Sequence, residues 1–149
     1  MKSKANNARY GLLMLEEDLF INSPYHNEDL RLILEAKDSY TAEALAEVAK
    51  NINSINSPYH QKDMILISRA DNEFFGYSEI GLQDLAINED SLKDKYHLEN
   101  MQILAEHTIA NEELFCIMTD SRFIKGKNYR KEVEILKNAK SKINSRALY

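Results

Sequence analysis

The dipeptide Tyr-His occurs three times in this chain, at residues 25–26, 59–60 and 96–97. Histidine could carry acid–base chemistry or bind a metal, because it titrates near neutral pH and its neutral ring ligates zinc. The first two copies lie in an identical stretch, INSPYH, at 21–26 and 55–60. The histidines are therefore either a chemical motif presented several times or the mark of a structural repeat.

The identical stretch belongs to a longer internal repeat. Residues 43–70 align with residues 80–107 without a gap at a shift of 37, and the first copy matches the second at a shift of 34. A degraded fourth copy follows, in which Arg130 stands where the histidine is expected. Repeats of this period indicate an array of stacked units with atypical terminal copies. Within a single domain, 1–149, we expect units at about 4–38, 39–71, 77–107 and 110–142.

The first half of each unit has the pattern of a helix, because its apolar residues recur at helical spacing. Thr41 and Ser78 are the expected N-cap residues of this helix in the second and third units. Asn51 and Asn88 stand where the helix is expected to stop, since Asn tolerates the left-handed conformation that ends helices.

A second helix is expected to begin at the Tyr-His pair. Ser23 and Ser57 are candidate N-caps, Pro24 and Pro58 occupy the first helical position, and Asp94 replaces the Ser in the third unit. The sequence therefore predicts an all-α fold of about eight helices in four pairs, either a short right-handed αα solenoid or a compact bundle.

The repeat makes a shared metal site at the histidines implausible on geometric grounds. Equivalent residues on stacked helices stand roughly 8–10 Å apart, whereas zinc needs its nitrogen ligands about 2.0–2.1 Å from one centre. We expect the tyrosines to pack between units and the histidines to bond nearby backbone; the alternative is a ladder that lines a binding groove. This structural repeat motif comprises Tyr25, His26, Tyr59, His60, Tyr96 and His97.

The charge is distributed unevenly along the chain. Residues 122–149 hold nine Lys or Arg against two Glu, whereas residues 1–121 hold ten basic and twenty-two acidic side chains. An acidic body of this kind repels nucleic acid and attracts basic partners. Acidic residues that recur on corresponding parts of two units could form a docking stripe, or an ordinary solvated face; they are Glu43, Glu47, Asp84, Glu89 and Asp90.

A second candidate contact is the segment DNEFFGYS at 71–78, which carries Phe74, Phe75 and Tyr77. Aromatic side chains on a polar loop either fill the core or anchor a protein interface. If the chain has an interface hot spot, we expect it here.

Signals for catalysis, cofactors and membranes are missing from the sequence. Cys116 lies in the apolar helical pattern ELFCIMTD, which predicts a buried and inert thiol. No Gly-rich phosphate loop, paired-Cys metal signature or nucleophile elbow occurs. The single cysteine, the lack of a long apolar run and the lack of a signal-peptide pattern predict a cytoplasmic chain with no cofactor, metal or membrane span.

The layout LxxLAxN–loop–YHxxxMxIL, over roughly residues 10–140, resembles the group of HEAT, armadillo and leucine-rich variant repeats. The chain lacks the Pro, Asp and Arg positions typical of HEAT units. The resemblance implies a protein-binding surface rather than an active site. In size and charge the chain is similar to small bacterial immunity proteins, which implies an inhibitor that covers the basic groove of a toxin nuclease. The alternatives are a nucleic-acid-binding HEAT-like protein that uses its basic C-terminal unit, and an interaction scaffold.

Overall fold

The computed structural model describes residues 2–70, 77–106 and 112–147, with side chains over 8–70, 79–106 and 114–138. The described residues form twelve helices, in four successive groups of three. They are α1 (Lys2–Met14), α2 (Asp18–Ile21), α3 (His26–Leu34), α4 (Ser39–Ala49), α5 (Ile52–Ile55), α6 (His60–Arg69), α7 (Tyr77–Ile87), α8 (Glu89–Lys93), α9 (His97–Glu106), α10 (Glu112–Thr119), α11 (Ser121–Ile124) and α12 (Tyr129–Ala147).

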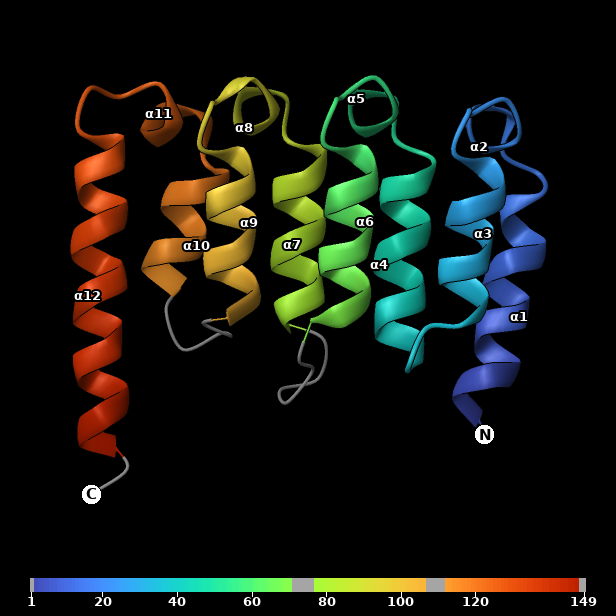
Figure 1. Ribbon diagram of the computed structural model, residues 1–149, viewed down its shortest axis with the longest axis horizontal. Coiled ribbons are helices and arrows are strands. Elements are labelled where there is room, and N and C mark those ends of the chain that lie inside the picture. The colour runs from blue at the N-terminus through green and yellow to red at the C-terminus, as the bar shows by residue number, and fades with distance from the viewer. Residues whose placement is uncertain (1, 71–76, 107–111, 148–149) are drawn as a thin grey trace.

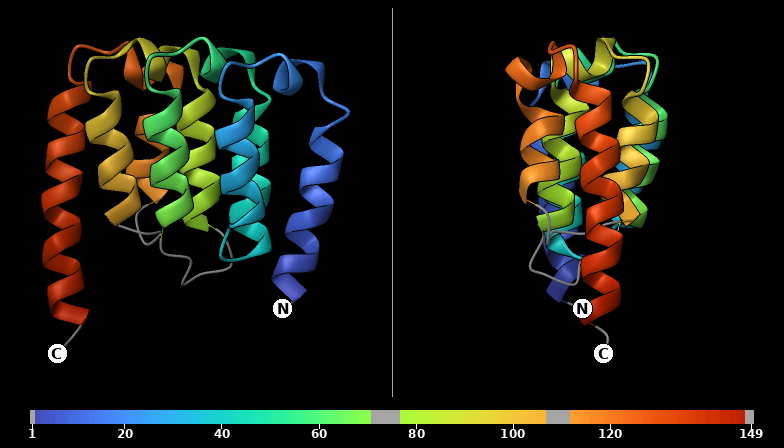
Figure 2. Two further views of the ribbon diagram at one scale, coloured as in Figure 1. Left: turned by 45° about the vertical axis from the view of Figure 1, so that its right-hand side comes forward. Right: turned by 90° about the vertical axis from the view of Figure 1, so that its left-hand side faces the viewer.

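The helices stack side by side as a row of hairpins (Figure 1). The first long helices of the groups, α1, α4, α7 and α10, form one layer, and α3, α6 and α9 form the second (Figure 2). Helix α12 packs against α10 and closes the end of the array (Figure 2). The short helices α2, α5, α8 and α11 lie along one edge (Figure 1). The all-α prediction is confirmed. The count is twelve rather than eight because each expected connection contains a short helix.

The short helices correct the predicted role of two asparagines. Asn51 and Asn88 do not end the first helices in a left-handed conformation; both have extended backbones and are the N-caps of α5 and α8. The Asn51 side chain accepts from the Asn53 and Ser54 amides, and the Asn88 side chain accepts from the Ser91 amide. Asn supplies a capping oxygen as readily as Asp or Ser, so the residue starts the next helix.

The predicted starts of the first helices are also corrected. Asp38, not Thr41, is the N-cap of α4, and its carboxylate accepts from the amide and the hydroxyl of Thr41. Ser78 lies inside α7, which begins at Tyr77. A carboxylate at the N-cap also interacts favourably with the helix dipole, so the helix begins earlier than the Thr predicts.

The second helices begin at the histidine of each Tyr-His pair, as predicted. The predicted N-caps are wrong: Tyr25 and Tyr59 are the N-caps of α3 and α6, and Pro24 and Pro58 lie in the turn before each helix rather than at its first position. The serines and Asp94 stabilise that turn instead. Ser23, Ser57 and Asp94 each accept, through a side-chain oxygen, from the amide two residues ahead at 2.8–3.0 Å. That amide belongs in every case to the tyrosine of the Tyr-His motif. The NSP segment is therefore a turn that places the Tyr-His pair at the N-terminus of the second helix.

The core lies between the two layers and continues from one end of the array to the other. Several of its large side chains have no exposed surface, including Leu45, Met64, Leu82, Met101 and Leu114. Burial of this apolar area supplies most of the driving force for folding. No helix among the described residues has the length and apolar character needed to cross a membrane.

Glu79 is a buried carboxylate of the third unit. Glu79, in the first turn of α7, has a fully buried side chain. Neither of its oxygens has a hydrogen-bond partner among the described residues, and the Lys37 Nζ lies 4.0 Å from Oε1. Burial raises the pKa of Glu79 above its ordinary value, against a smaller opposing effect of Lys37.

The raised pKa of Glu79 predicts how a Glu79→Gln variant responds to pH. A carboxyl whose folded pKa exceeds its unfolded value contributes stability that is complete below about pH 4 and is lost as the pH rises through the folded pKa. We therefore expect Glu79→Gln to be more stable than the wild type at pH 8, with the difference closing in acid. Urea denaturation at several pH values measures this. A difference that is independent of pH would contradict the assignment.

Candidate functional site

The second Tyr-His pair lies at the boundary between the first two units. The His60 Nε2 donates to the Asp29 Oδ2 at 2.7 Å, and the His60 Nδ1 is 2.8 Å from the Ser54 hydroxyl. The ring of Tyr25 stacks on the His60 ring, with centroids 4.6 Å apart. The histidine on α6 is thus held by two residues of the preceding unit that stand one helical turn apart, Tyr25 and Asp29.

The next boundary repeats this arrangement. The His97 Nε2 donates to the Asp63 Oδ2 at 2.7 Å, the His97 Nδ1 is 2.9 Å from the Ser91 hydroxyl, and the Tyr59 ring stacks on His97. We call these boundary contacts the junction ladder. They extend along the second layer, from α3 to α9.

At the third boundary the same geometry is made from different residues. Arg130 takes the place of the histidine, with its guanidinium over the Tyr96 ring at 4.4 Å. Asn100 takes the place of the aspartate, accepts from Arg130 at 2.9 Å and donates to the Tyr129 hydroxyl. A cation over an aromatic face is attractive, so the substituted junction keeps both of its contacts.

The junction ladder has the residue types of a catalytic triad but not its accessibility. Ser54, His60, Asp29 and their counterparts Ser91, His97, Asp63 are all buried, with at most 1% of each residue exposed. No substrate can reach a hydroxyl in this position, and nucleophilic catalysis needs one at a pocket. The expectation that histidine bonds backbone holds for His26, whose Nδ1 lies 3.2 Å from the Phe20 carbonyl oxygen. For His60 and His97 it is wrong, because side chains of two units bind them.

The two acids of the junction ladder, Asp29 and Asp63, were not predicted from the sequence. Asp29 and Asp63 are related by the same shift of 34 that relates the histidines, and Asn100 follows at 37. Burial raises the pKa of both acids, and the hydrogen bond from histidine opposes that shift. Among the described residues, no group of three or more His, Cys, Asp or Glu is arranged to hold a metal ion.

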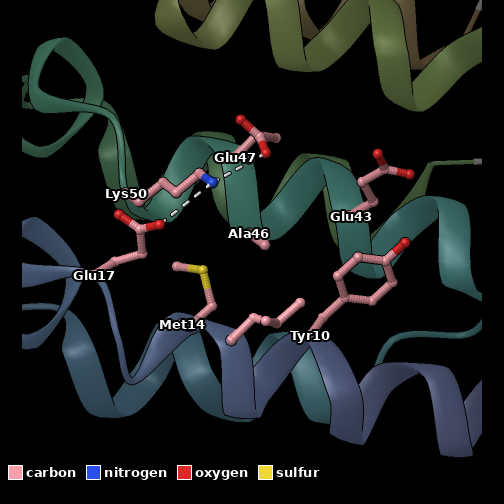
Figure 3. Close-up of a pocket in the computed structure, with 8 residues that line it drawn as sticks. Tyr10, Met14, Glu17, Glu43, Ala46, Glu47 and Lys50 are labelled. Atoms are coloured by element: carbon pink, nitrogen blue, oxygen red, sulfur yellow. Dashed lines mark ion pairs between the residues drawn. The ribbon is translucent and has the colours of Figure 1, made fainter.

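A groove lies between α1 and α4, and side chains from both helices line it (Figure 3). Its volume is about 120 Å³. Apolar side chains from both helices line its base, and three carboxylates and a tyrosine surround them. The lining residues are Tyr10, Leu13, Met14, Glu17, Glu43, Ala46, Glu47 and Lys50. We call this the acidic groove.

The charges in the acidic groove are only partly compensated. The Lys50 ammonium lies 3.3 Å from Glu47 and 3.8 Å from Glu17 (Figure 3). Glu43 lies on the other side, near the tip of Tyr10 (Figure 3); burial and, to a lesser degree, the Glu43 carboxylate raise the pKa of Tyr10. An apolar base beneath carboxylates suits the side chain of a Lys or Arg, whose methylene stem is apolar and whose head is charged.

The structure brings together only two of the predicted acidic residues. Glu43 and Glu47 line the acidic groove. Glu89 lies on α8 and pairs with Lys93 at 3.0 Å, and Asp90 joins α8 to Lys125, near α11, at 3.4 Å. Asp84 is half-buried on α7, where burial raises its pKa. The five acids therefore do not form one continuous stripe.

The predicted aromatic contact lies outside the described residues. Phe74 and Phe75 are not described, and Tyr77 begins α7 with a side chain that is not described. Glu17 and Tyr10 were not predicted as site residues. No sequence signal pairs them with Glu43, because the contact depends on how α1 packs against α4.

The prediction of a buried thiol is wrong, because Cys116 is exposed. On α10 the residues two positions before and after it, Leu114 and Met118, are both fully buried. Residues four apart share one face of a helix, and the residue midway between them lies on the opposite face. The apolar segment around Cys116 therefore did not show which face of α10 is buried.

Removing a ladder acid is expected to loosen a unit boundary. Asp63→Ala leaves the buried His97 Nε2 without an acceptor, so we expect a loss of about 3 kcal/mol in the free energy of unfolding. Asp63→Asn is expected to cost less, because an amide oxygen still accepts, as Asn100 does at the third boundary. Urea denaturation measures both. The exposed Gln61→Ala on the same helix is the control, with a change within about 0.5 kcal/mol, and an equally small effect of Asp63→Ala would contradict the prediction.

Comparison with known proteins identified no relative of this chain. No protein-family model, no curated protein and no solved structure matches the chain. The likeness to HEAT and armadillo repeats therefore stays a prediction from the repeat pattern. The function has to be argued from the surfaces of the array itself.

Proposed function

We propose that this chain is a non-enzymatic protein-binding module whose acidic groove captures a basic segment of a partner protein. The observation that carries the proposal is the set of three carboxylates, Glu17, Glu43 and Glu47, around an apolar base. Only Lys50 offsets them within the groove. Tyrosine beside a carboxylate also suits an arginine, which stacks on aromatic rings and hydrogen-bonds carboxylates.

We further propose that the partner is a toxin nuclease and that the chain is its immunity or inhibitor protein. Nuclease grooves are basic because they hold a phosphate backbone, so an acidic surface can occlude them by charge complementarity. The excess of acidic side chains over residues 1–121 supports long-range attraction to such a partner. A reducing cytoplasm is consistent with one free, exposed thiol.

Nucleic-acid binding through the C-terminal unit is the less supported function. Among its described basic side chains, at least three form ion pairs: Arg122 with Asp120, Lys125 with Asp90, and Arg130 with Glu99 and Glu134. A phosphate-binding surface needs basic groups that are available to neutralise the backbone. An interaction scaffold that has no inhibitory role also remains compatible with the acidic groove.

A pull-down with matched variants tests the proposal. The tagged chain is incubated with lysate of the source organism, with and without nuclease treatment, and bound proteins are identified by mass spectrometry. We expect the wild type to retain a basic protein in both samples. We expect the Glu43→Gln/Glu47→Gln variant to retain at least tenfold less of the basic protein, because the groove then keeps one carboxylate beside Lys50.

The control is Glu89→Gln/Glu132→Gln, which removes the same charge away from the groove. Equal loss in both double variants would show that net charge rather than the groove binds the partner. Recovery only without nuclease would support nucleic-acid binding instead. If a basic partner is retained, loss of its nuclease activity on adding the chain separates an inhibitor from a scaffold.

A further inference from the structure

Each unit after the first has a face that packs against the preceding unit, and the junction ladder lies in this contact. The second unit presents His60, Met64 and Ala46 toward the first: His60 bonds Asp29, Met64 lines a groove with Asp29, and Ala46 lines the acidic groove with α1. All three are buried, with exposed fractions of 0%, 0% and 6%. The contacts to the histidine come from Tyr25 and Asp29, four residues apart on the preceding helix.

The first unit presents the same face with nothing described in front of it. At the shift of 34, His26, Leu30 and Leu12 correspond to His60, Met64 and Ala46. Leu12 is 67% exposed, and Leu30 and His26 are half-buried. Leu30 lies beside α1 at Gly11, where an added Cβ would be 3.5 Å from its Cδ1. We call this surface the N-terminal face.

We propose that the N-terminal face docks a helix of a partner protein that carries Tyr-X3-Asp and an adjoining apolar stripe. The same pair, Tyr then Asp four residues later, covers the equivalent histidine at both of the first two boundaries. The partner's tyrosine stacks on the His26 ring, its carboxylate accepts from the His26 Nε2, and its apolar residues cover Leu12 and Leu30. This surface is separate from the acidic groove. The groove is proposed to bind a basic side chain, whereas the N-terminal face would bind a carboxylate at His26.

Protonation follows from the one bond that His26 already makes. The His26 Nδ1 donates to the Phe20 carbonyl, because a carbonyl oxygen only accepts. A carboxylate on Nε2 therefore requires the doubly protonated ring, which a close carboxylate favours. Phe20 stands where Ser54 and Ser91 stand in the next units, so the first unit keeps the histidine but holds it through backbone.

A second copy of this chain does not supply the required helix. Its internal Tyr-X3-Asp pairs, Tyr25 with Asp29 and Tyr59 with Asp63, are covered by its own following units. In the last unit the tyrosine is Tyr129, and the residue four positions later is Val133, which is fully buried and offers no acceptor. Head-to-tail stacking would therefore leave His26 without a carboxylate.

The test uses a peptide with the sequence of residues 22–36, NSPYHNEDLRLILEA, labelled with a fluorophore and held helical by a staple on its solvent face. Fluorescence anisotropy follows its titration with the full-length chain. We expect saturable binding that weakens at least tenfold when the chain carries Leu12→Glu, which changes an exposed side chain, or His26→Gln. We expect a similar loss when the peptide has Asn at its aspartate or Ala at its tyrosine.

The controls separate this proposal from the proposed function. The peptide has three acidic residues and one arginine, so the acidic groove does not attract it, and Glu43→Gln/Glu47→Gln should bind it as the wild type does. Ile135→Glu, at an exposed position on α12, should also leave binding unchanged. Absence of saturable binding, or binding that ignores both Leu12→Glu and the Asp-to-Asn peptide, would overturn the proposal.

Discussion

The array depends on a buried hydrogen bond between an imidazole and a carboxylate that crosses each of the first two unit boundaries. An uncompensated carboxylate in an apolar interior is costly, so each ladder acid fixes the position of the next unit by requiring its histidine. One oxygen of Asp29 and one of Asp63 have no hydrogen-bond partner among the described residues, which leaves the histidine as the principal compensation. Register along the array is therefore specified by polar groups, while stability comes from the apolar core.

The same constraint explains why the Tyr-His pair is repeated. In the second copy the tyrosine stacks on the next histidine and the histidine bonds the previous aspartate, so this copy serves two boundaries. The tyrosine of the first copy and the histidine of the third copy make the equivalent contacts. The first and last units have no neighbour on one side among the described residues, and their sequences differ there from the repeat. Phe20 replaces the serine in the first unit, and Val133 replaces the aspartate in the last. Chemistry available to a ligand consequently lies away from the ladder, on the surfaces between and beyond the units.

Two such surfaces have opposite character. The acidic groove combines carboxylates with an apolar base where α1 packs against α4, which suits a basic side chain. The N-terminal face presents an imidazole among exposed leucines, which suits an acidic and apolar helix. The first unit contributes to both: α1 forms one side of the acidic groove, with α4 of the second unit on the other side, and Leu12, His26 and Leu30 form the N-terminal face.

The sequence by itself determined the all-α fold, the repeat and the start of the second helices at the Tyr-His pairs, because these depend on local periodicity. It misplaced the N-caps of those helices, because Ser23 and Ser57 bond the amide of a turn that precedes the helix. It did not identify Asn51 and Asn88 as N-caps, since the short helices that they begin have too few residues for a periodic signal. The tertiary structure alone decided that Asp29 meets His60 and that Tyr10 and Glu17 join Glu43. It also decided that Cys116 faces outward. These outcomes depend on which helix faces pack together, and a face is selected by burial across the whole array rather than by any one segment.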